Sequence, residues 1–178
     1  MKFFLSFSIG IVVALLIMGG IVFFFLPSPY KIQQQVLISA TQKNVFNQVD
    51  YMKNWGKWAF EDQKPEERPE VYLQGPEDGV GAIIEWTDEY NTVRIEIVES
   101  EPYELIKAKI LNIKGGQESE LTFEFIQEND QIKLVLTETG DFGLDFSSRL
   151  NAKLFDFEGN MEEVYLSRLL ALKSVCEN

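Results

Sequence analysis

The chain has 178 residues, of which 28 are acidic and 16 basic, with a single cysteine and no histidine. Without histidine the protein lacks the commonest general base and the commonest transition-metal ligand, which excludes zinc sites and Ser-His or Cys-His catalytic pairs. The single cysteine, Cys176, has no partner for an intramolecular disulfide. The net charge of −12 repels nucleic acid. We therefore expect no metal, no cofactor and no nucleic-acid partner.

The N-terminus carries a long uncharged segment. Residues 3–26 are 24 consecutive residues without a charge. As a helix they would be about 36 Å long, enough to cross a hydrocarbon core of about 30 Å. A cleaved secretory signal would have an apolar stretch of about 7 to 15 residues and a small-x-small cleavage site, and this segment has neither. We predict that residues 1–26 are a transmembrane anchor, with the membrane as a partner through residues 3–26.

The charges around this segment predict its orientation. Lys2 and the amino terminus are the only positive charges before it, and no acidic residue occurs there. The positive-inside rule then keeps the N-terminus in the cytoplasm, although Lys31 and Lys43 follow on the other side. The predicted localisation is a single-pass membrane protein with an extracytoplasmic domain.

Residues 27–30 (Pro-Ser-Pro-Tyr) read as a short, stiff linker, and residues 31–178 as one domain. Residues 31–39 should be extended, and Thr41 is a suitable N-cap for a short helix that ends near Gly56. Five later segments alternate between apolar and polar residues with period two, which predicts strands of an antiparallel sheet with one solvated face. These segments are 80–86, 93–97, 106–110, 121–125 and 132–136.

From about Ser147 the apolar residues recur every three or four positions, as on an amphipathic helix. One helix of about 28 residues, capped by Ser147 or Ser148, would be about 40 Å long and could lie across the sheet. The order of elements predicts an α+β fold with the helices on one face. The apolar stripe consists of Leu150, Leu154, Phe157, Met161, Tyr165, Leu169, Leu172 and Cys176.

Several segments together resemble the START/Bet v 1-like (SRPBCC) superfamily: Val45-Phe46, the tryptophan cluster 54–58, the turn 75–81 and the ending 170–173. The chain is most similar to the polyketide cyclase/dehydrase-like branch, many of whose members begin with one transmembrane helix and a Leu-Pro-Ser segment like 26–28. The resemblance implies the helix-grip fold, a seven-stranded curved sheet around the C-terminal helix, often with an apolar cavity. Two departures are Gly56, where the branch commonly has proline, and Ala59-Phe60 after the cluster.

The inner face of the sheet and the helix stripe are expected to enclose a narrow cavity. Trp55 and Trp58 could rim its entrance, although packing of the first helix against the sheet explains them as well. The candidate ligand-binding residues are Ile84, Trp86, Ile95, Phe123, Phe125 and Leu136 of the sheet, with Phe157, Met161 and Tyr165 of the helix.

Three functions fit this pattern. The first is a membrane-tethered binding module for an apolar small molecule or lipid. The second is an enzyme of cyclase, dehydratase or hydrolase type that uses carboxylates or tyrosines in the same cavity. The third is a tethered protein-interaction domain with a filled core. An enzyme should place an ionisable group inside, and Tyr165 is the only such residue nominated, so the sequence favours binding and nominates no catalytic residue.

Overall fold

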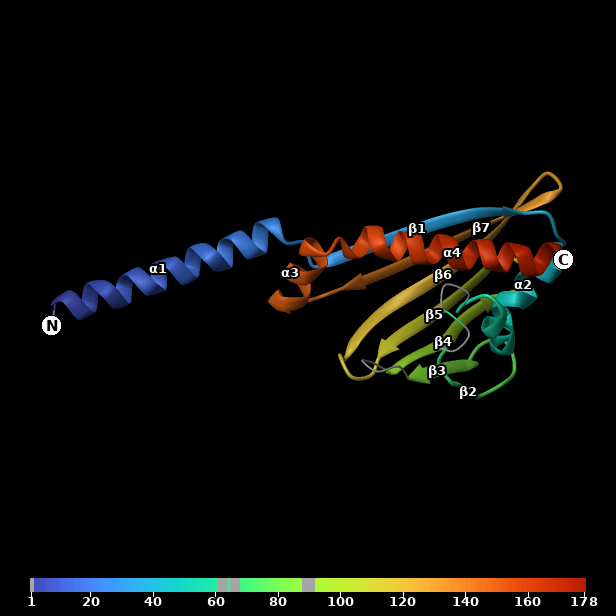
Figure 1. The fold of residues 1–178 in the computed structure, drawn as a ribbon, viewed down its shortest axis with the longest axis horizontal. Helices are drawn as coiled ribbons and strands as arrows, with labels where there is room; N and C mark the ends of the chain where they lie inside the picture. The colour runs from blue at the N-terminus through green and yellow to red at the C-terminus, as the bar shows by residue number, and fades with distance from the viewer. Residues whose placement is uncertain (1, 61–63, 65–67, 88–91) are drawn as a thin grey trace.

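The computed structural model describes residues 2–60, 64, 68–87 and 92–178, and within the first helix the side chains of residues 7–21. Four α-helices, one 3-10 helix and seven strands are present in this part of the chain (Figure 1). In chain order they are α1 (Lys2–Phe25), β1 (Pro29–Ile38), α2 (Gln42–Asp50), η1 (Met52–Lys57), β2 (Val71–Gln74), β3 (Ile83–Thr87), β4 (Thr92–Glu101), β5 (Leu105–Asn112), β6 (Gln117–Glu128), β7 (Gln131–Asp141), α3 (Phe146–Leu154) and α4 (Phe157–Glu177).

Helix α1 extends away from the rest of the chain (Figure 1). Its described side chains are almost all exposed, and Leu16 is 70% exposed. Among the residues that the structure describes, no helix combines the length and apolar character that crossing a membrane requires. The helix expected over residues 3–26 is therefore present, while its role as a membrane anchor stays a prediction.

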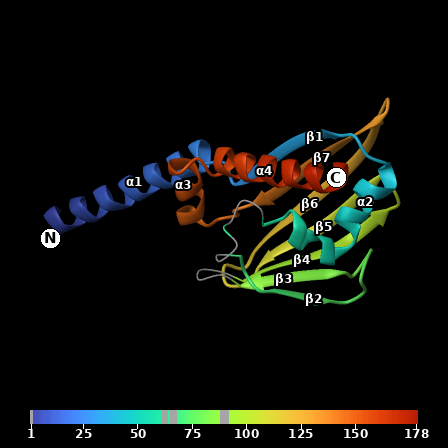
Figure 2. The same cartoon turned by 45° about the vertical axis from the view of Figure 1, so that its right-hand side comes forward.

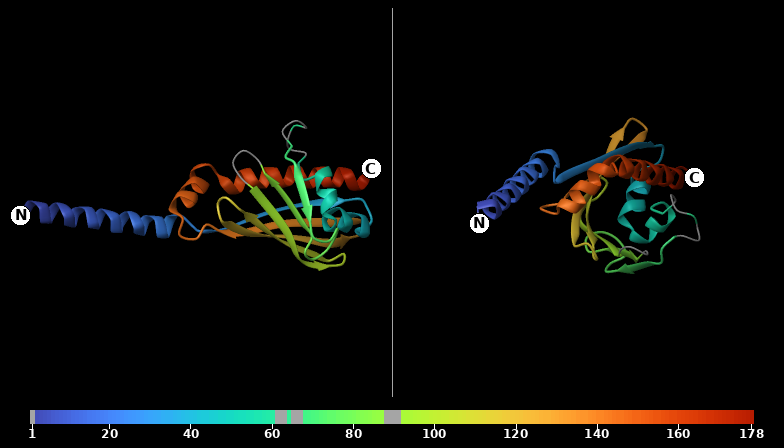
Figure 3. Two further views of the ribbon diagram at one scale, coloured as in Figure 1. Left: turned by 90° about the horizontal axis from the view of Figure 1, so that it is seen from below. Right: turned by 60° about the vertical axis from the view of Figure 1, so that its left-hand side comes forward.

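The seven strands form one antiparallel sheet in the order β1-β7-β6-β5-β4-β3-β2. The sheet curves around α4, which lies beside β1, while α2 and η1 lie towards its other edge (Figures 2 and 3). This architecture confirms the predicted α+β fold with a curved antiparallel sheet and a long C-terminal helix. Strand β2 was not predicted, because three of its four side chains are exposed and no alternation marks it.

Strand β1 begins at Pro29, two residues earlier than predicted, so half of the predicted linker belongs to the sheet. Tyr30 pairs with Gly140 of β7. A Cβ atom on Gly140 would lie 2.4 Å from the Tyr30 ring, so only glycine leaves room for the ring to cover this position. Thr41 caps α2 as predicted, since its hydroxyl accepts a hydrogen bond from the amide of Asn44.

The C-terminal segment forms two helices, so the prediction of one continuous helix was wrong. Asp145 caps α3 by accepting hydrogen bonds from the amides of Ser147 and Ser148, the two residues predicted as caps. The break lies at Asp156, whose φ of 47° is left-handed. Aspartate tolerates this conformation better than most residues. Gly159 then lets the Asp156 carboxylate approach, because a Cβ there would lie 2.4 Å from it.

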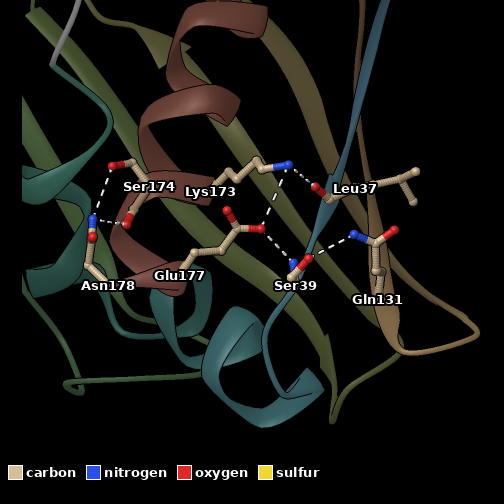
Figure 4. A network of polar contacts seen from close by, with 7 residues as sticks. All are labelled: Leu37, Ser39, Gln131, Lys173, Ser174, Glu177 and Asn178. Carbon is tan, nitrogen blue, oxygen red and sulfur yellow. Dashed lines mark hydrogen bonds and ion pairs between the residues drawn. The ribbon is translucent and has the colours of Figure 1, made fainter.

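The C-terminal half of α4 is fixed to the edge of the sheet by polar contacts (Figure 4). Lys173 donates to the carbonyl of Leu37 at 2.7 Å, and the amide of Ser39 donates to the Glu177 carboxylate at 2.6 Å. Gln131 of β7 donates to the Ser39 hydroxyl at 2.8 Å. Beneath these contacts the buried residues Leu169, Leu172 and Cys176 fill the core.

Candidate functional site

A cavity of about 330 Å³ lies between the N-terminal half of α4, the inner face of β3 to β7 and the residues of and after η1. Its volume is at the lower end of the range of small-molecule pockets, about 300 to 1,000 Å³. Most of its wall is apolar and comes from Trp55, Trp58, Ala59, Phe60, Trp86, Val93, Ile95, Ile110, Leu121, Phe123, Leu136, Phe157 and Met161.

Seven of the nine residues predicted to bind a ligand line this cavity: Trp86, Ile95, Phe123, Leu136, Phe157, Met161 and Tyr165. The other two, Ile84 and Phe125, are buried in the core and lie outside the cavity wall. The Phe125 ring packs against Phe46 of α2, with 5.2 Å between the ring centroids.

All three tryptophans of the chain line the cavity. Trp55 and Trp58 also pack against each other and against Phe123 of the sheet, which agrees with the packing role; whether they rim an entrance stays a prediction. The indole of Trp55 donates to the carbonyl of Val49 at 2.7 Å, which fixes the ring. The ring of Phe60 packs edge to face against the ring of Trp86, with 5.2 Å between the ring centroids. The aromatic wall is therefore held in place from α2 and η1 on one side and from β3 on the other.

A buried carboxylate, Glu138 of β7, interrupts the apolar wall and is 5% exposed. Its Oε1 atom accepts hydrogen bonds from the hydroxyls of Tyr30 at 3.1 Å and Ser119 at 2.6 Å. Its Oε2 atom accepts one from the hydroxyl of Tyr165. Two strands, β1 and β6, and helix α4 thus each bring one hydroxyl to the carboxylate of β7. We call Glu138, Tyr30, Ser119 and Tyr165 the Glu138 cluster.

The two phenols of the cluster keep their protons. Burial, and then the negative charge of Glu138, raise the pKa of Tyr30 and of Tyr165 above the ordinary value of 10.0. Arg168, which also lines the cavity one turn after Tyr165, acts in the opposite direction on the pKa of Tyr165. Near neutral pH both phenols therefore serve as hydrogen-bond donors to Glu138.

Neither the family models nor the curated proteins compared with the chain give a match. Solved structures do. The Aha1 dimer from Colwellia psychrerythraea matches with a TM-score of 0.60 and 14% identity over 83% of this chain and 96% of that one. CV1439 from Chromobacterium violaceum matches with a TM-score of 0.61 and 14% identity over 83% and 97%. DynU16 of the dynemicin biosynthetic locus matches with a TM-score of 0.56 and 14% identity over 81% of this chain and 46% of the DynU16 chain.

The chain has the Bet v 1/SRPBCC-like helix-grip fold. Identities this low establish the fold alone. Within the helix-grip fold of this chain, the cavity occupies the space that the first turns of α4 leave above the sheet.

Of the Glu138 cluster, Tyr165 was predicted from the sequence, whereas Glu138, Ser119 and Tyr30 were not, although alternation along their strands indicates them. Side chains alternate across a strand, so two more residues after Leu136 place Glu138 on the inner face. Likewise, Ser119 precedes Leu121 by two residues and Tyr30 precedes Ile32 by two, so both side chains also lie on the inner face. Among the described residues, no three His, Cys, Asp or Glu side chains come together as a metal site would require.

Proposed function

We propose that the domain binds a small, largely apolar molecule in the cavity between the sheet and α4. The observation that carries this proposal is the cavity of about 330 Å³ with a predominantly apolar, aromatic wall. The helix-grip fold of the neighbouring structures supports it, as does the resemblance to the polyketide cyclase/dehydrase-like branch. The seven predicted residues in the wall are proposed as ligand contacts.

The state of the Glu138 cluster favours binding over acid-base catalysis. A general acid or base works best when its pKa lies near the working pH. The pKa values of Tyr30 and Tyr165 are raised away from neutrality, and both hydroxyls already donate to Glu138. The cluster is therefore built to hold its protons and to present a fixed polar surface.

An enzymatic alternative of cyclase, dehydratase or hydrolase type is favoured by one observation, the ionisable Glu138 inside the cavity. In an enzyme this carboxylate would take a proton from the substrate. The two functions differ in what happens to a bound compound. A binding protein releases it unchanged, whereas an enzyme releases a product of different mass or structure.

The binding proposal is tested by native mass spectrometry of the full chain after incubation with membrane lipid extract. We expect a retained apolar species. Met161 lies in the cavity wall, so Met161→Trp should displace that species while the protein stays folded. The matched control is Leu170→Trp, on the same helix at a position that is 51% exposed, which should retain the species.

A filled core gives a different result. Without a cavity, Met161→Trp overpacks the interior and lowers the free energy of unfolding by about 1 to 3 kcal/mol. No retained species, together with a Met161→Trp variant that is only destabilised, would favour the protein-interaction domain instead.

We also propose that α1 tethers the domain to a membrane. The uncharged run of 24 residues supports this proposal, as do the exposed side chains of α1. Apolar side chains are also exposed in and beside α3, where Arg149 donates to the carbonyl of Leu26 just after α1. The exposed apolar side chains in and beside α3 are those of Leu144, Phe146, Leu154 and Phe155.

Fractionation tests the tether. The full chain should sediment with membranes, and a chain that lacks residues 1–28 should be soluble and unfold cooperatively. A reporter that is active only after export, fused to Asn178, tests the predicted extracytoplasmic orientation. A full chain in the soluble fraction would refute the tether, and activity of a cytoplasm-only reporter at Asn178 would refute the orientation.

A further inference from the structure

The hydrogen bonds of the Glu138 cluster limit the kind of ligand that the cavity accepts. The hydroxyls of Tyr30, Ser119 and Tyr165 each have one proton, and each donates it to Glu138. The cluster therefore has no donor left. A carboxylate has about four acceptor positions, and three donors occupy three of them. Oε1 receives two hydrogen bonds and Oε2 receives one, so an acceptor position on Oε2 stays open, together with the lone pairs of the three hydroxyls.

Resting on the proposed binding function, we propose that the ligand carries a hydrogen-bond donor, a hydroxyl or a protonated amine, on the end that lies against Glu138. A ligand group that reaches the cluster leaves water, because Glu138 is 5% exposed and Tyr165 is buried as well. A ligand donor that gives up its hydrogen bond to water on entering the cavity regains one from the Glu138 carboxylate. A group with acceptors only, such as an ether or a carboxylate, meets other acceptors and stays unpaired.

Charge within the cavity acts in the same direction. Glu138 places a negative charge in an apolar wall, which attracts a cationic head group and repels an anionic one. Arg168 is the described side chain that opposes this preference, since it also lines the cavity and is positively charged. Arg168 also has an interaction of its own within the protein. A ligand that selected Arg168 instead would be an anion, which gives the experiment a clear opposite outcome.

The rest of the cavity fits the remainder of such a molecule. Along the inner face of the sheet, the neighbours of the cluster are Leu121, Leu136 and Ile110, followed by the aromatic side chains of Phe123 and Trp86. The inferred ligand is therefore a small amphiphile, with an apolar or aromatic body and one donor head group.

The experiment uses the full chain in phosphatidylcholine nanodiscs and four compounds with the same bromophenyl body. These are 4-bromobenzyl alcohol, 4-bromobenzylamine, 4-bromobenzyl methyl ether and 4-bromophenylacetate. Bromine quenches tryptophan fluorescence on close contact, and all three tryptophans line the cavity, so quenching reports binding. We expect the alcohol and the amine to bind about tenfold more tightly than the ether, the effect of one hydrogen bond to a charged group. The acetate should bind most weakly.

Glu138→Gln should remove the preference for the amine over the ether, because the amide is neutral and has donors of its own. Glu120→Gln is the matched control, since Glu120 lies on the same sheet but is exposed and outside the cavity wall. It should keep the order of affinities. The order of the four affinities in the unaltered protein tests the proposal by itself, so the test does not depend on whether Glu138→Gln folds.

Equal affinities for the four compounds would overturn the inferred head group and leave the proposed function intact. Tightest binding of the acetate would also overturn it, in favour of recognition by Arg168. No quenching by any of the four would contradict the proposed function itself.

Discussion

Tyr165 of α4 donates a hydrogen bond to Glu138 of β7, which joins the closing helix to the sheet through the wall of the cavity. The two residues are 27 positions apart in the chain, and Tyr30, which donates to the same carboxylate, is 108 positions from it. One side chain thus connects the first strand, the last strand and the last helix. Its removal should affect both stability and ligand selection.

The first prediction concerns the stability that Glu138 supplies. Glu138→Ala leaves the hydroxyls of Tyr30, Ser119 and Tyr165 without their acceptor, and an unsatisfied buried polar group costs about 1 to 3 kcal/mol. We expect urea denaturation to show a loss of at least this size. Glu120→Ala, on the exposed face of β6, should change the free energy of unfolding by less than about 0.5 kcal/mol. Equal losses in the two variants would contradict the role given to the cluster.

The second prediction concerns alkaline pH. Burial, and then the charge of Glu138, raise the pKa of Tyr165, so the folded protein holds this proton above pH 10.0, where the unfolded chain releases it. Unfolding then releases a proton, and stability must fall as the pH rises above 10.0. Below that pH both states are protonated and the shift has no effect. Tyr165→Phe should reduce the loss between pH 9 and 11 in denaturation experiments. An unchanged pH dependence in this variant would count against the assignment.

The third prediction concerns the close approach of Tyr30 to Gly140. A Cβ at Gly140 would lie 2.4 Å from the ring, so Gly140→Ala should displace Tyr30 from its place beside Glu138. We expect a loss of about 1 to 3 kcal/mol, as for other overpacked positions. Gly56→Ala is the control, because no atom lies within 4 Å of a Cβ built there. If both variants are as stable as the parent, the packing of Tyr30 on Gly140 is not tight.

The fourth prediction concerns Cys176, which is a free thiol and is buried in the structure. Burial, and then the nearby Glu177, raise the pKa of this thiol to about 11. Because the thiolate is the reactive form, a disulfide reagent at pH 8 should modify Cys176 slowly in the folded protein and rapidly in urea. Equal rates in the two conditions would mean that the end of α4 is open.

Much of the apolar part of the site could be predicted from sequence, because alternation in a strand translates directly into a face of the sheet. This rule placed Ile95, Phe123 and Leu136 on the inner side. Alternation does not distinguish residues that line a cavity from residues buried in the core. Ile84 and Phe125 were therefore predicted to bind a ligand, although both lie in the core outside the cavity wall.

The polar part of the site depends on contacts between distant segments. Alternation places Glu138 on the inner face, but nothing near it in the sequence reveals that Tyr30 supplies one of its donors. The break at Asp156 was hidden for a different reason. Phe157 and Met161 continue the apolar spacing of α3, so the periodicity passes through a position where a single left-handed residue changes the direction of the chain.

The central claim is that a small molecule occupies the cavity, and anomalous diffraction from a co-crystal with 4-bromobenzyl alcohol tests it most directly. We predict a bromine peak inside the cavity beside Trp86, Phe123 and Met161, with the hydroxyl of the compound directed towards Glu138. A cavity closed by rotated side chains, with no bromine peak inside it, would contradict the account.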